Sequence, residues 1–144
     1  PEETIRRLRD QGAFISVSHP FDRLRKGAWE TADLLAILDQ VDALEVFNAR
    51  CVYGADNKAA QSFAAQHHKP GTVGSDAHFP YELARATLIM PPFEGAASFA
   101  AALSQARQDN HLSPVWVHGL SKYAKYMRKW GIRPMPNGAS EIDA

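Results

Sequence analysis

The sequence has 144 residues, of which 45% are apolar and 22% charged, a composition ordinary for a folded domain with a real core. Its 16 basic and 16 acidic residues cancel, so we expect no long-range field that would recruit nucleic acid or an anionic membrane. The single cysteine, Cys51, excludes an internal disulfide framework and a cysteine-rich zinc site. No apolar run reaches the length of a membrane span, and we expect a cytoplasmic protein without a membrane partner.

The first elements alternate between helix and strand. Residues 2–11 have apolar positions at helical spacing, with acids first and arginines later, as the helix dipole favours. Residues 13–18 predict an apolar strand that ends at His19, which Pro20 is expected to hold in an extended conformation. Because the sequence begins without methionine and as if already inside a helix, we expect it to be a fragment of a longer protein.

The same alternation continues along the chain. A broad apolar face predicts a helix at residues 31–40, and an alanine-rich segment predicts another at residues 55–67. Apolar segments predict strands at residues 43–48, 71–74 and 85–90. Helices and strands that alternate at spacings near one βα unit indicate an α/β protein with a largely parallel sheet.

Toward the C-terminus the pattern weakens. An alanine-rich segment predicts a helix at residues 95–109, and a basic, aromatic segment predicts another at residues 121–129. The tail from residue 134 onward is expected to be loosely ordered. We therefore divide the chain into a main domain, residues 1–110, and a helical extension with a loose tail, residues 111–144.

Polar residues follow three successive predicted strands: His19 the first, Asn48 and Arg50 the second, Asp76 and His78 the third. In parallel sheets the functional groups sit at the C-terminal ends of the strands. In an extended segment, residues two apart point to the same side, so Asp76 and His78 should face one point. A carboxylate and imidazoles that converge suit Zn²⁺, Mn²⁺ or Fe²⁺. We predict a metal or substrate site at this edge; the alternative is that Asp76 caps a helix and His78 is a surface residue.

With these residues in order, the chain resembles the C-terminal part of the PHP (polymerase and histidinol phosphatase) family. The matching segments are Ser18-His19-Pro20, Glu45-Val46-Phe47-Asn48 and Gly74-Ser75-Asp76-Ala77-His78. The resemblance covers residues 2–90, and residues 74–90 also resemble the PHP-associated region that follows many of these domains.

That resemblance implies a fold, cofactors and an activity. The fold would be the C-terminal portion of a distorted (βα)₇ TIM-like barrel, with mostly parallel strands and flanking helices. The cofactors would be two or three divalent metal ions, Mn, Zn, Fe or Mg. The activity would be metal-dependent hydrolysis of a phosphomonoester or phosphodiester, with a small phosphorylated metabolite or nucleotide as the substrate.

Residue by residue, the resemblance implies that His19, Asp76 and His78 are metal ligands, and that Asp76 is also catalytic through a hydrogen bond to the attacking water. Asn48 and Arg50 are our own extension as substrate-binding residues, because an arginine at this edge suits a phosphate oxygen. The family's N-terminal His-x-His pair, Thr-Asp-His segment and later glutamate ligand are absent from this sequence. We therefore expect weak metal binding and little activity from these residues by themselves.

Several alternatives stay open. The chain could belong to a catalytically degenerate PHP-like scaffold or regulatory module, or to an amidohydrolase-like enzyme that cleaves a C–N bond. Glu45, inside a predicted strand, could be buried and paired with a neighbour such as Arg50 or Arg85, or it could face the site. The loop with Arg23, Arg25 and Lys26 is expected to be solvated, with contact to a phosphate as the alternative.

Overall fold

The computed structural model describes residues 1–25 and 28–131, which fall into two units, Pro1–Ser113 and a second unit that begins at Pro114. The second unit contains α5 (Trp116–Lys129), a helix that begins before the predicted residue 121. The tail predicted from residue 134 lies outside the described residues. Within the described part of the chain, no helix combines the length and the apolar character needed to cross a membrane.

The first unit follows the predicted alternation of helices and strands. The predicted strands at residues 43–48 and 71–74 are present with these bounds. The elements in chain order are α1 (Glu2–Asp10), β1 (Ser16–Val17), α2 (Thr31–Ile37), the 3₁₀ helix η1 (Leu38–Gln40), β2 (Ala43–Asn48), α3 (Gly54–Gln66), β3 (Gly71–Gly74), the 3₁₀ helix η2 (Pro80–Glu82), β4 (Ala86–Ile89), α4 (Gly95–Leu103) and β5 (Arg107–Asn110).

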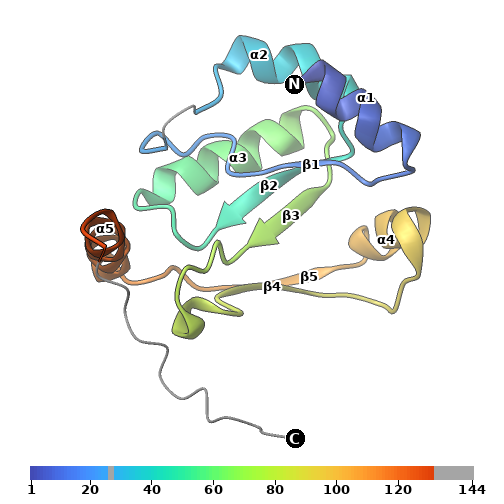
Figure 1. Ribbon diagram of the computed structural model, residues 1–144. Helices are drawn as coiled ribbons and strands as arrows, with labels where there is room; N and C mark the ends of the chain where they lie inside the picture. Colours follow the sequence, from blue (N-terminus) through green and yellow to red (C-terminus); the bar gives the residue numbers. More distant parts are fainter. Residues whose placement is uncertain (26–27, 132–144) are drawn as a thin grey trace, which may run out of the picture. The chain divides into compact units, whose positions relative to one another are not determined.

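The first three strands form a parallel sheet in the order β1-β2-β3. Consecutive strands are joined through helices, and α3 packs along β2 (Figure 1). The mixed α/β class with parallel strands and flanking helices is therefore confirmed. The hydrophobic core consists of buried aliphatic side chains from the sheet, from the helices α1, α2, η1 and α3, and from residues that adjoin them: Ile5, Ile15, Val17, Leu34, Ile37, Leu38, Val41, Leu44, Val46 and Ala64.

The fourth predicted strand forms, but it belongs to a separate two-stranded ribbon in which β4 pairs with β5 in antiparallel fashion. The prediction of a single helix over residues 95–109 is wrong in its second half. The helix ends at Leu103, and Arg107–Asn110 form β5. These residues are polar and mostly exposed, so they lack the alternation of a half-buried strand, and pairing with β4 sets their conformation.

Asp42, just before β2, links that strand by a hydrogen bond to the segment before β1. Its carboxylate accepts hydrogen bonds from the Ile15 backbone N–H at 2.7 Å and from the Arg9 guanidinium at 2.8 Å. Burial by itself raises the pKa of Asp42, but these hydrogen bonds and the charges of Arg9 and Lys69 outweigh it, and the pKa lies below 3.8. Folding therefore favours the ionised carboxylate.

Candidate functional site

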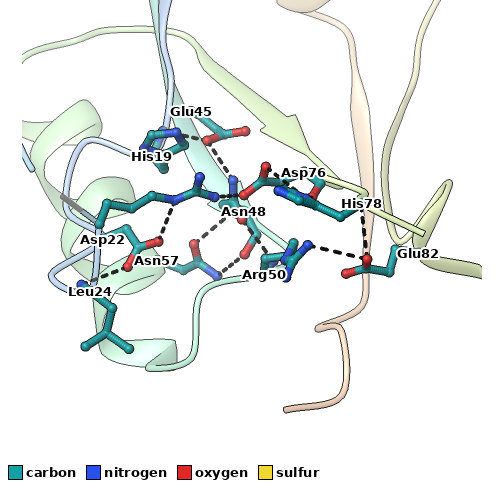
Figure 2. A network of polar contacts seen from close by, with 11 residues as sticks. His19, Asp22, Leu24, Glu45, Asn48, Arg50, Asn57, Asp76, His78 and Glu82 are labelled. Atoms are coloured by element: carbon teal, nitrogen blue, oxygen red, sulfur yellow. Dashed lines mark hydrogen bonds and ion pairs between the residues drawn. The ribbon is translucent and has the colours of Figure 1, made fainter. Parts of the chain in front are cut away.

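The predicted site residues gather where β1, β2 and β3 end. Figure 2 shows the polar network at this edge, in which His19 follows β1, Asn48 ends β2, and Asp76 and His78 follow β3. The carboxyl ends of these strands lie together because the strands are parallel neighbours in one sheet.

His19 has a φ angle of 34°, so the prediction of an extended backbone at this residue is wrong. Its backbone N–H donates to Glu45 Oε2 at 2.5 Å. A left-handed backbone at a residue other than glycine costs about 1–3 kcal/mol and persists only where its surroundings hold it. The Glu45 carboxylate supplies that restraint and faces the site. It lies against Gly74, where an added Cβ atom would be 2.0 Å from Glu45 Oε1.

Asp76 and His78 come together, but through a turn rather than an extended segment. The φ angle of Asp76 is 50°, and β3 ends two residues earlier, at Gly74. The Nδ1 atom of His78 lies 2.8 Å from the backbone oxygen of Asp76 and 3.9 Å from its Oδ1 atom. Two of the three predicted metal ligands, His19 and Asp76, thus have a left-handed backbone, a feature that clusters at functional sites.

An arginine from the loop after β1 contacts the Asp76 carboxylate. The Arg25 guanidinium forms an ion pair with Asp76, and its Nε atom donates to Asp22 Oδ2 at 3.2 Å. The neighbouring Arg23 donates to the buried Asp56 on α3 at 2.7 Å. Both loop arginines are therefore held by acids, and Arg25 lies directly at the predicted metal-binding carboxylate.

Asn48 and Arg50 lie at the end of β2, but they are only 2% and 5% exposed. The Asn48 side chain accepts a hydrogen bond from the Arg50 backbone N–H at 2.9 Å and donates one to Glu45 at 3.2 Å. Asn57 of α3 exchanges two hydrogen bonds with the Asn48 backbone, at 2.9 and 3.1 Å. The Arg50 guanidinium lies 3.5 Å from Glu82. Contact of Asn48 and Arg50 with a substrate stays a prediction.

Glu82 of η2 is a fully buried carboxylate that sequence reasoning missed. Its Oε2 atom accepts hydrogen bonds from the backbone N–H groups of His78 at 3.0 Å and Phe79 at 3.1 Å, beside the ion pair with Arg50. An acid four residues after a histidine carries no recognisable signal by itself. Its partners are backbone groups, so only the folded turn reveals them.

The electrostatics of the edge favour a neutral imidazole at His78. The His78 side chain is 49% exposed. Partial desolvation and then the positive charge of Arg50 lower its pKa below 6.5, while Glu82 acts in the opposite direction and Arg25 adds to the lowering. A neutral imidazole is the form that binds a metal ion. Burial, together with the charges of Asp22, Asp56 and Glu45, raises the pKa of Cys51 to about 12, so this thiol is not an activated nucleophile.

The donor types fit part of a metal centre, because imidazole and carboxylate groups suit Zn²⁺, Mn²⁺ and Fe²⁺. Nevertheless, over residues 1–25 and 28–131 no three side chains of His, Cys, Asp or Glu lie close enough together to hold a metal ion. The structure brings together Asp76 and His78, and places Arg25 against Asp76. The described residues thus supply a partial set of ligands, and the ligand roles of His19, Asp76 and His78 stay predictions.

Part of the chain matches a known protein family. Residues 54–107 match the family model described as PHP-associated. The resemblance to the C-terminal region of the PHP family is confirmed. This PHP-associated match begins at α3 and extends to the first residue of β5, so it includes the Asp76 and His78 turn.

A relative from Methanocaldococcus jannaschii, the uncharacterized protein MJ0417, is 37% identical over an alignment of 87 residues that covers 58% of this chain. The chain spans 37% of the length of that relative. No solved structure matches the chain significantly.

Proposed function

We propose that this chain is the C-terminal part of a PHP-type enzyme that hydrolyses phosphoesters with divalent metal ions. The observation that carries the proposal is the left-handed backbone at both His19 and Asp76, each at the end of a parallel strand. In the proposed enzyme His19, Asp76 and His78 hold a metal ion together with ligands from the rest of a longer protein. Such a metal ion lowers the pKa of bound water and neutralises charge on phosphoryl oxygens.

The chain's own residues have defined tasks in this proposal. The turn after β3 carries Asp76 and His78, and the low pKa of His78 keeps its ring ready to bind near neutral pH. Arg25 stands against Asp76, where its guanidinium is suited to a phosphate oxygen once the carboxylate binds a cation.

The shape of the first unit also fits a larger barrel. β1 is an edge strand of its sheet, and an apolar groove of about 350 Å³ lies beside it. The groove is lined by residues of α1 and β1, with Trp29 and Ile37 nearby. A further βα unit of a TIM-like barrel would pair with this edge and fill the groove.

The test compares phosphoester and amide substrates side by side with added Mn²⁺, using the longer protein that contains this chain. We expect phosphoester turnover, and we expect Asp76→Ala to reduce it by about 100-fold or more without loss of the fold. The exposed Asp39 gives a matched control, because Asp39→Ala removes an acid of the same type away from the edge. Unchanged turnover in Asp76→Ala would refute the role of Asp76, and turnover of the amide alone would favour the amidohydrolase alternative.

A second candidate function is a degenerate PHP-like scaffold or regulatory module. The pairing of Arg25 with Asp76 favours it, since a guanidinium at the predicted ligand can replace the cation in a module that no longer binds metal. In that case Mn²⁺ should leave the His19 and His78 signals of the chain unbroadened in NMR spectra, and Arg25→Ala should destabilise the fold.

A further inference from the structure

The turn that carries His78 is held from the protein interior by a carboxylate that faces no solvent. Glu82 is 0% exposed, and its Oε2 atom accepts a hydrogen bond from the backbone N–H of His78 at 3.0 Å. Arg50, 5% exposed, lies 3.5 Å from the same carboxylate oxygen. A buried carboxylate is tolerated only where an opposite charge and hydrogen bonds compensate it, so Arg50 and the backbone N–H groups make this arrangement possible.

The His78 ring is restrained as well. Its Nδ1 atom lies 2.8 Å from the backbone carbonyl oxygen of Asp76. A carbonyl oxygen can only accept a hydrogen bond, so Nδ1 must carry the hydrogen, and in the neutral ring the free lone pair is on Nε2. The contact therefore selects one tautomer and presents Nε2 as the atom available to a ligand.

We propose that Glu82, whose charge is offset by Arg50, is a positioning residue for His78. It holds the His78 backbone where the ring Nδ1–H can donate a hydrogen bond to the backbone oxygen of Asp76, and this leaves Nε2 as the ligand atom. The inference rests on the proposed function for the metal at Nε2, but the ring geometry itself does not depend on metal. Arg50 acts on this turn only by offsetting the buried charge of Glu82, so it is not needed once residue 82 is neutral; this role is separate from its predicted contact with the substrate.

The experiment separates the hydrogen-bond acceptor from the charge. Each of two double variants replaces both members of the ion pair, so that no buried charge is left without its partner. They are Arg50→Met with Glu82→Gln, and Arg50→Met with Glu82→Leu. Glutamine keeps an oxygen that can accept from the His78 backbone N–H, whereas leucine does not. The readout is the ratio of the Nδ1–H to the Nε2–H tautomer of His78, measured from imidazole ¹⁵N chemical shifts above the pKa of the ring.

We expect the Nδ1–H tautomer to dominate in the unmodified chain and in the glutamine variant. In the leucine variant the ratio should fall by about fivefold, as expected for the loss of one hydrogen bond. An unchanged ratio in a folded leucine variant would overturn the inference. Gly71→Ala is the control for general destabilisation, because the three atoms nearest to a Cβ atom there all belong to Val46, the closest at 2.6 Å.

A Zn²⁺ titration of the same samples distinguishes the inference from the proposed function. If Glu82 controls the tautomer but Zn²⁺ shifts no His78 signal in the unmodified chain, positioning stands and the metal role of these residues loses its support. If Zn²⁺ shifts the His78 signals but the tautomer ratio is the same in the glutamine and leucine variants, the metal role stands and positioning by Glu82 is refuted.

Discussion

Gly74→Ala is expected to displace the Glu45 carboxylate from the network at the strand ends. The added Cβ atom would lie 2.0 Å from Glu45 Oε1, whereas ordinary contact begins at 3.4 Å, so the carboxylate must move by about 1.4 Å. Such a movement is large enough to break the hydrogen bonds from the His19 backbone at 2.5 Å and from Asn48 at 3.2 Å. Hydrogen bonds to a charged acceptor contribute about 1.5–3 kcal/mol, so we expect a loss of about 2 kcal/mol in the free energy of unfolding.

A double-mutant cycle with Glu45→Ala tests this reasoning. Once the carboxylate is absent, the methyl group of Gly74→Ala enters vacated space and should cost almost nothing. The two substitutions should therefore be non-additive by about 2 kcal/mol in urea unfolding followed by circular dichroism. Gly54→Ala is the control, since its Cβ atom would meet nothing within 4 Å and its effect should not depend on Glu45. Additive effects of Gly74→Ala and Glu45→Ala would refute the proposed contact.

Three further outcomes are expected. Gly71→Ala should destabilise the chain by about 1–3 kcal/mol, because its Cβ atom would overlap the stiff, buried Val46; an unchanged urea midpoint would contradict that packing. Asp42→Asn should cost about 1–2 kcal/mol near neutral pH. Because the pKa of Asp42 is lowered on folding, its contribution is present above the unfolded-state value of 3.8 and is lost as the pH falls through the folded-state pKa. The difference in stability between the two proteins should therefore shrink below that pH, and a constant difference would refute the linkage. The raised pKa and burial of Cys51 predict slow alkylation by iodoacetamide in the folded chain and fast alkylation in urea.

Much of the fold could be predicted because the apolar pattern and the turn residues place the helices and strands at the same positions. Strands at residues 43–48 and 71–74 lie where the sequence places them, since they are short apolar segments between helices. The strand at Arg107–Asn110 could not be predicted from pattern, because exposed polar residues form it through backbone pairing with β4.

The clustering of the predicted residues at one edge of the sheet could be predicted from the sequence, but the hydrogen bonds that connect them could not. Polar residues at the ends of parallel strands pointed to the edge where His19, Asp76 and His78 lie. The sequence did not indicate that Arg50 is buried, nor that Glu82 receives backbone N–H groups from the His78 turn. The buried Arg50 meets Glu82 across 32 positions, which no local pattern indicates. The hydrogen bond from His78 to Glu82 spans only four residues, but it follows a backbone conformation at Asp76 that no local pattern requires.

The positive φ angles at His19 and Asp76 limit which amino acids these two positions can accept. Glycine and asparagine relax such a backbone, whereas metal ligation calls for histidine or a carboxylate. Aspartate and histidine supply ligand atoms at these positions, but each holds the backbone at a conformational cost that glycine avoids. Selection for stability would therefore favour His19→Gly, whereas selection for activity would oppose it. In homologues that no longer need catalysis, glycine would be expected to accumulate at this position.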